Sequence, residues 1–309
     1  MTVKGAWKIT KQTFSDFIDN KVLKLSAALA YYTIFSLPGL IIVVIWISDI
    51  FYGDKAVEGT VYGQIAGLVG RDAALQIQQT IRNATLSYET GFATTIGIAT
   101  LIFGATSIFG EIQDSINAIW RLKAKPRKGW VKLIVNRLLS FSLIITLGFL
   151  LLVSLIINAV MDAFINKLTV IFPHTEVIIA YVFNVLLSFA ITSFLFGLIF
   201  KVLPDAKIEW RHVRAGAFTT ALLFMIGKLG ISYYLGHNRL TSAYGAAGSV
   251  IVILLWVYYS ATILYFGAVF TRVYAIHKGS HIYPNNYAVW IEQVEVESDK
   301  SVQEQAKDL

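Results

Sequence analysis

The chain has 309 residues, of which 56% are hydrophobic and 15% charged, and its formal net charge is +7. Soluble domains carry about 25% charged residues, so this composition and the length of the apolar runs exclude an ordinary water-soluble domain. The absence of cysteine excludes disulfides, iron–sulfur clusters, thiolate zinc sites and cysteine nucleophiles.

The residues before the first apolar run form a polar segment of mixed charge, over 1–24. Trp7, Phe14, Ile18 and Leu25 fall on one helical face with lysines around them. This pattern predicts either a short helix lying at the cytoplasmic interface or the first turns of a long first helix.

Six apolar segments follow, each long enough to cross the hydrocarbon core of a bilayer as a tilted helix. They do not alternate polar with apolar residues, as the strands of a membrane β-barrel do. We therefore predict an all-α polytopic membrane domain over 25–275. Its spans are Leu25–Ile50, Gly91–Ile119, Ile134–Val160, Glu176–Phe200, Ala215–Gly236 and Gly248–Tyr274.

Two regions outside these spans also have a distinct composition. Residues 51–90, between the first and second spans, are too long for a simple connector and carry helical periodicity, which predicts a helical loop on the outer side. Residues 276–309 form a tail that turns acidic from Tyr283 onward and is expected to be partly disordered.

The distribution of basic residues predicts the orientation. Segments 1–24, 121–137, 201–214 and 272–309 hold 20 of the 26 lysines and arginines. Because basic loops stay in the cytoplasm, both termini are expected on the cytoplasmic side of a bacterial inner membrane. Topology thus explains the positive charge without nucleic acid. One loop could also contact anionic lipid head groups, through Arg121, Lys123, Lys125, Arg127 and Lys128.

Polar residues in the second span are candidates for function. Gly104, Ser107, Glu111, Ser115 and Ala118 share one helical face, bordered by Asp114. Such a stripe serves either to pack and hydrogen-bond neighbouring helices or to line a solute or proton path. We expect the isoleucines of this span, at positions 102, 112 and 116, to face lipid.

Lys228 is the only lysine well inside a predicted span. Its expected partner is Glu111 or Asp114, because a lone buried ammonium loses its proton. Alternatively, its long side chain reaches outward to the interface. A lipid-open cavity lined by Glu111, Asp114 and Tyr31 would favour transport over a structural role.

Two predicted helices contain interruptions. Pro38 and Gly39 lie in the middle of the first span, and Tyr244–Ser249, with Gly245 and Gly248, opens the sixth. Broken helices are typical of transporter sites, although kinking and tight packing explain them equally. Pro204 is expected only to stop the fourth helix at its cytoplasmic end.

Catalytic signatures are missing from the sequence. It holds no P-loop, no nucleophile elbow and no His-Glu-x-x-His helix. His277 and His281 are four residues apart but have no third ligand nearby. We therefore predict no enzyme, no cofactor and no metal site.

Several segments resemble the YihY/BrkB family of bacterial inner-membrane proteins, and the resemblance covers about residues 5–275. The segments that carry it are Leu25–Leu37 (LSAALAYYTIFSL), Phe103–Ser107 (FGATS), Gln113–Trp120 (QDSINAIW), Leu203–Asp205 (LPD), Tyr244–Val250 (YGAAGSV), then Trp256, Tyr258, Tyr259 and Phe266–Arg272 (FGAVFTR).

The resemblance implies a six-helix cytoplasmic-membrane protein but no settled activity. Members have carried a ribonuclease BN label and a serum-resistance label, and some relatives are thought to move lipids or lipid-linked envelope precursors. This sequence argues against the ribonuclease label, since it has no soluble domain with clustered His and Asp ligands.

Three functional classes therefore stand. The first is a transporter or flippase for a lipid-like or small anionic substrate, working without an ATP site. The second is a structural or regulatory membrane component that binds partners, and the third is an enzyme acting on lipids at the interface. Membrane lipids are expected partners in each case, and the small-residue faces would allow homo-oligomers.

Overall fold

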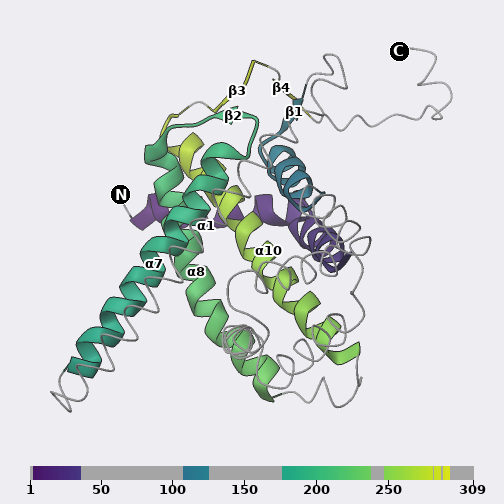
Figure 1. The fold of residues 1–309 in the computed structure, drawn as a ribbon. Helices are drawn as coiled ribbons and strands as arrows, with labels where there is room; N and C mark the ends of the chain where they lie inside the picture. Colours follow the sequence, from purple (N-terminus) through teal and green to yellow (C-terminus); the bar gives the residue numbers. More distant parts are fainter. Residues whose placement is uncertain are drawn as a thin grey trace, which may run out of the picture.

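The computed structural model describes residues 3–35, 107–124, 176–237, 247–280, 282–286 and 288–292. The predicted third span and the loop over 51–90 lie outside these residues, as do large parts of the first two spans and the tail beyond residue 292. Within them the chain is mostly helical, with two short strand pairs (Figure 1).

Three long helices dominate the described structure. They are α7 (Glu176–Val202), α8 (Trp210–His237) and α10 (Ala247–His277). Each contains a stretch long and apolar enough to cross a membrane: Val185–Val202, Trp210–Ile231 and Val250–His277. These helices match the predicted fourth, fifth and sixth spans, while the six-span arrangement as a whole stays a prediction.

Parts of the first two predicted spans are also helical. A shorter apolar helix covers Val22–Phe35. Residues 107–119 form a helix that ends where the second span was predicted to end.

The closest helix contact joins α8 to α10 through two glycines. Thr271 packs directly on Gly216, and Thr220 packs directly on Gly267, so that a Cβ atom on either glycine would overlap the facing threonine. Each threonine hydroxyl donates a hydrogen bond to a carbonyl one turn earlier in its own helix, at 2.7 Å. The hydroxyls are therefore satisfied although both threonines are fully buried.

Two other faces of α10 contact the helix over 107–119 and the N-terminal helix, whereas α7 packs mainly on α8. The indole Nε1 of Trp120, just after the helix over 107–119, donates a hydrogen bond to the Ala268 carbonyl at 3.0 Å. On another face, the Phe266 ring contacts the rings of Phe14 and Phe17, with centroids 5.4 and 5.8 Å away. Helix α10 thus contacts α8, the helix over 107–119 and the N-terminal helix on three different faces.

The N-terminal helix α1 (Val3–Asp19) is separate from the helix that follows it. The chain turns at Asn20 and Lys21, and Lys21 has a φ of 51°. Figure 1 shows α1 lying across the direction of α8 and α10. Of the two alternatives for this segment, the continuous long first helix is therefore wrong.

The prediction that Ile112 and Ile116 face lipid is wrong. They are 9% and 0% exposed and pack in the core with Ile119, whereas Asp114 and Ala118 are exposed. The reason is that residues spaced by three or four positions share one helix face. Lipid-facing and core-facing positions of a membrane helix are both apolar, so the pattern could not choose between them.

Two antiparallel strand pairs close one end of the bundle. Strand β1 (Leu122–Ala124) pairs with β4 (Ala288–Trp290), and β2 (Ala206–Lys207) pairs with β3 (Tyr283–Pro284). The segment after α10 thus contacts the chain just after the helix over 107–119 and the α7–α8 connection. We call this the capped end.

The glycine contact between α8 and α10 gives the first prediction. Gly216→Ala should destabilise the protein by about 1–3 kcal/mol, because the added methyl group overpacks a filled interface. Gly230→Ala is the matched control on the same helix, since no atom lies within 4 Å of a Cβ at that position. Thermal unfolding of the purified proteins checks this, and equal melting temperatures for the two variants would contradict it.

The β1–β4 register gives the second prediction. Lys123 faces Val289 directly, so Lys123→Cys with Val289→Cys should form a disulfide under mild oxidation. The native chain has no cysteine to compete. The control pair Lys123→Cys with Trp290→Cys should cross-link far less, because neighbouring strand residues point to opposite faces. Equal yields for both pairs would refute the register.

Candidate functional site

A buried carboxylate at the capped end joins segments from three parts of the chain. Asp205 is 3% exposed. Its carboxylate accepts hydrogen bonds from the side-chain amides of Gln113 and Asn117, both at 3.0 Å. Its backbone N–H donates to the Asn117 Oδ1 at 2.9 Å, and its carbonyl accepts the Asn285 N–H at 2.9 Å.

Local sequence explains how these groups meet. Helix α7 ends at Val202, as the following Pro204 predicts. The turn then continues with a hydrogen bond from the Ala206 N–H to the Pro204 carbonyl, and this turn holds Asp205 over the bundle. Gln113 and Asn117 lie one helical turn apart and therefore point toward it together.

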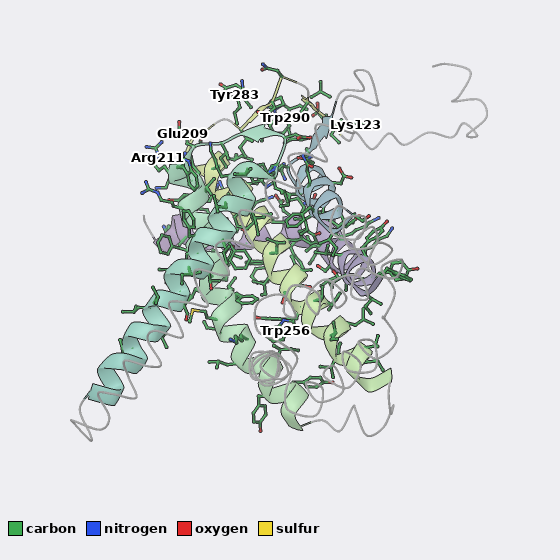
Figure 2. The ribbon with its side chains drawn as sticks, in the orientation of Figure 1. Lys123, Glu209, Arg211, Trp256, Tyr283 and Trp290 are labelled. Atoms are coloured by element: carbon green, nitrogen blue, oxygen red, sulfur yellow. The ribbon has the colours of Figure 1, made fainter. Side chains whose placement is uncertain are left out.

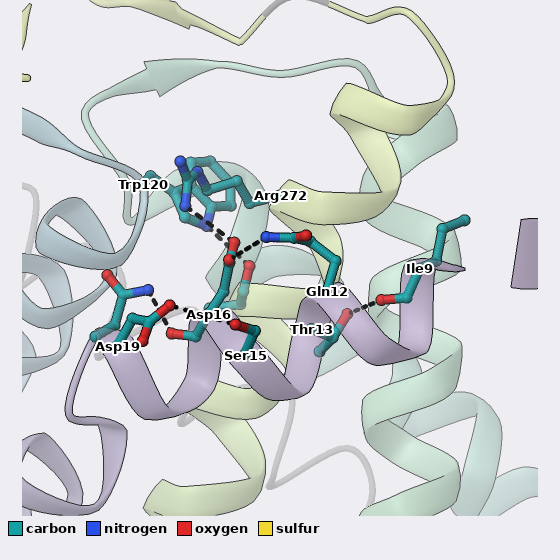
Figure 3. Close-up of polar contacts among 10 residues, drawn as sticks. Ile9, Gln12, Thr13, Ser15, Asp16, Asp19, Trp120 and Arg272 are labelled. Atoms are coloured by element: carbon teal, nitrogen blue, oxygen red, sulfur yellow. Dashed lines mark hydrogen bonds and ion pairs between the residues drawn. The ribbon is translucent and has the colours of Figure 1, made fainter. Parts of the chain in front are cut away.

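A second polar contact attaches α1 to α10. Arg272, which is 8% exposed, lies with its Nη1 atom 3.4 Å from Asp16 Oδ2. Gln12 Nε2 donates to the other oxygen of Asp16 at 2.6 Å. Figure 3 shows these groups beside the buried Trp120. The ion pair compensates a charge that would otherwise be costly to bury.

The predicted polar stripe forms a third group, between the helix over 107–119 and α10. The Ser115 hydroxyl, on a residue 2% exposed, donates to Glu111 Oε1 at 3.3 Å. Both Ser115 and the half-buried Glu111 lie beside Tyr265, and Tyr265 is fully buried. The Tyr265 hydroxyl finds no hydrogen-bond partner among the described residues. This group places an acceptor carboxylate and two buried hydroxyls side by side.

Lys228 and Glu111 do not meet. No ion pair joins them in the part of the chain that the structure describes. Lys228 follows Gly227, which packs on Tyr259 of α10, whereas Glu111 lies beside Tyr265. Six residues along α10 correspond to about 9 Å. The predicted pairing with Glu111 is therefore wrong. Lys228 is half-buried and lies on α8, whereas Glu111 lies on the helix over 107–119.

The other predicted site residues scatter. Asp114 is exposed, Ser107 is half-buried, and Tyr31 is 61% exposed with its ring against Phe35 at 4.7 Å. Tyr31 therefore belongs to an exposed aromatic face and not to the interior around Glu111.

The residues proposed for helix interruption and lipid contact are partly described. Gly248 lies in the first turn of α10. Arg121, with a φ of 56°, and Lys123 are exposed at the capped end. The remaining predictions fall outside the described residues: Pro38, Gly39, Tyr244, Gly245, Lys125, Arg127 and Lys128.

Sequence reasoning missed Asp205, which it treated only as the residue after a helix-stopping proline. The signal available was a carboxylate, a proline and two amides spaced by four, all within segments that carried the family resemblance. Nothing in the spacing said that they meet, since Asn117 and Asp205 are 88 positions apart. As for metals, no group of three or more His, Asp or Glu residues able to hold an ion occurs in the described ranges.

Comparison with known proteins agrees with this architecture. The family model for Virulence factor BrkB matches residues 13–287. The chain belongs to this family. The match confirms the resemblance to YihY/BrkB proteins that the Leu203–Asp205 segment and the second span had indicated.

Relatives in the BrkB family are named as membrane proteins. A UPF0761 membrane protein of Xanthomonas campestris pv. campestris (strain B100) is 27% identical over 253 residues, covering 82% of this chain and 57% of the relative. One from Saccharophagus degradans is 25% identical over 87% of this chain and 60% of its own length.

A third relative, from Pseudoalteromonas atlantica, is 28% identical over 79% of this chain and 78% of its own length. The chain thus spans somewhat more than half of the first two relatives. No solved structure matches it. These findings show a membrane protein of the BrkB and UPF0761 type, and they name no substrate.

The Asp205 group gives the third prediction. Asp205→Ala should cost about 1–3 kcal/mol, because it leaves the buried Asn117 amide without its acceptor. Asn117→Ala should cost a similar amount, and the double variant little more than either, since both remove one shared contact. Denaturation of the three variants and wild type in detergent measures the coupling. Strictly additive losses would show that the contact contributes no stability.

Proposed function

We propose that this BrkB-family protein is a transporter or flippase that moves a lipid-like or small anionic substrate of the cell envelope across the bacterial inner membrane. The observation that carries the proposal is the group of Glu111, Ser115 and Tyr265 in a chain with apolar spans. Ionisable groups within membrane spans are costly and usually serve substrate or ion movement.

The chemistry of this group suits proton or ion coupling. Glu111 can take up and release a proton while Ser115 holds one of its oxygens. The buried Tyr265 hydroxyl, which lies beside Ser115 and Glu111, can donate to a passing polar group. Lys228, on α8, offers a positive charge for an anionic substrate. Transport would then run by ion coupling or downhill flow.

The proposal includes an orientation. In it, the capped end faces the cytoplasm, because the exposed cations Lys123, Lys207 and Arg211 lie there. Figure 2 shows Lys123 and Arg211 at this end. Basic residues are retained on the cytoplasmic side, so both termini and the loop after Arg121 would be cytoplasmic in a six-span arrangement.

The fourth prediction concerns transport by reconstituted protein. Wild type in proteoliposomes should move a fluorescent phospholipid or one of a panel of small anions. Glu111→Gln should reduce movement to the rate of protein-free vesicles, because glutamine cannot carry the proton. Tyr265→Phe should slow movement about tenfold, which corresponds to the loss of one hydrogen bond of roughly 1.4 kcal/mol. Lys228→Ala should abolish movement of anions.

Glu209→Gln is the matched control, since the Glu209 side chain is 67% exposed and pairs with Arg211 at the surface. All variants are first shown to be folded by their elution and thermal unfolding. Folded Glu111→Gln protein that transports at the wild-type rate would refute the role of Glu111. Folded wild type that moves none of the solutes would favour the second candidate function.

That second candidate is a structural or regulatory membrane component. The observation in its favour is the capped end, where Tyr283 and Trp290 are 60% and 46% exposed (Figure 2). Exposed aromatic side chains are enriched at protein-binding surfaces. Changing the two exposed aromatic residues, Tyr283→Ala with Trp290→Ala, would then remove a partner captured by the wild-type protein while leaving any transport intact.

A further inference from the structure

Helix α1 presents three different faces along its length. One face is packed on the bundle, and its centre holds Ile9 and Thr13, which are 3% and 0% exposed. Asp16 on the same face pairs with Arg272 of α10, and Phe17 contacts Phe266 at one edge. This face fixes the helix to the rest of the protein.

A second face of α1 is apolar and bare. Trp7, Phe14 and Ile18 are 72%, 55% and 71% exposed. At about 100° per residue they fall within about 40° of one another. No part of the described chain covers them, apart from the edge contact of Phe14 with Phe266.

The third face is polar and exposed, and it lies between the other two on the far side. At the same rotation per residue, its members fall in a sector about 80° wide that excludes every large apolar side chain of the helix. They are Lys4, Lys8, Gln12, Ser15 and Asp19. A helix with one side on protein, one bare and apolar, and one polar has the geometry of a helix lying in a membrane surface.

The level at which α1 crosses α10 indicates what covers the bare face. The contacts run from Phe266, about three turns before the end of α10, to Arg272, about one and a half turns before it. Both residues lie inside the apolar stretch Val250–His277. The bare face is therefore level with a stretch long and apolar enough to cross a membrane, where lipid would surround it.

We propose that α1 lies in the membrane leaflet on the capped side and binds anionic phospholipid. Trp7, Phe14 and Ile18 insert among the upper acyl chains, and Lys4, Lys8 and Lys11 contact the phosphates. Lys11 borders the apolar face, and its long side chain reaches from there to the head groups. Cations near an anionic leaflet each contribute about 1 kcal/mol of binding. This inference is independent of the transport proposal.

Single-cysteine spin labels test the position of α1, since the native chain has no cysteine. Trp7→Cys, Phe14→Cys and Ile18→Cys are labelled in the full chain and reconstituted into phosphatidylcholine–phosphatidylglycerol vesicles. Lys8→Cys and Ser15→Cys are the controls on the polar face of the same helix. Accessibility of each label to molecular oxygen and to a water-soluble nickel chelate gives its depth.

The expected result is high oxygen and low chelate accessibility at positions 7, 14 and 18, with the reverse at 8 and 15. High chelate accessibility at all five positions would place α1 in water and overturn the proposal. Immobilised labels at 7, 14 and 18 that neither reagent reaches would show a protein partner or a second copy instead, and would overturn it equally.

The lysines are tested separately from the apolar face. The label at position 14 should lie deeper in vesicles containing phosphatidylglycerol than in pure phosphatidylcholine. Changing Lys4, Lys8 and Lys11 together to Gln should remove this difference, while the oxygen accessibility in phosphatidylglycerol still exceeds that of the chelate. Equal depth of the unchanged protein in both lipids would overturn the anionic preference.

Discussion

The close approach of α8 and α10 at two glycines is the contact on which the rest of the described structure depends. Thr271 of α10 packs on Gly216 of α8, and Thr220 of α8 packs on Gly267 of α10. In each helix the threonine lies one turn after the glycine. Lipid provides no hydrophobic drive between helices, so close van der Waals packing and internal hydrogen bonds must hold them. The two Gly-x-x-x-Thr runs supply the close packing, and the Tyr259 hydroxyl of α10 donates a hydrogen bond to the Phe224 carbonyl of α8 at 3.1 Å.

With α8 packed on one side, α10 contacts other parts of the chain through its remaining faces. Tyr265 and Ala268 contact the helix over 107–119 and the tryptophan that follows it, whereas Phe266 and Arg272 hold α1. Glu111 and Lys228 therefore lie on two different helices, the helix over 107–119 and α8, and both of these helices contact α10. A movement of α10 would therefore alter the surroundings of both residues.

The capped end shows how polar groups are managed at the end of such a bundle. Asp205 is buried, and its carboxylate accepts hydrogen bonds from two side-chain amides. Hydrogen bonds to a buried carboxylate stabilise it only when they are complete. The backbone carbonyl of Asp205 also accepts the Asn285 N–H from the segment after α10. One residue thus joins the helix over 107–119 through its side chain and the segment after α10 through its backbone.

The sequence by itself determined the class of protein, the positions of its three described long spans, the end of α7 before Pro204 and the family. These features follow from local properties: run length, a missing proline N–H, and motifs read in order. Tertiary structure alone decided that Ile112 and Ile116 are buried, that α1 is a separate helix, that Glu111 neighbours Tyr265 and not Lys228, and that Asp205 binds Asn117. Hydrophobicity is the same toward lipid and toward another helix, and contacts between residues 88 positions apart leave no periodic trace along the chain.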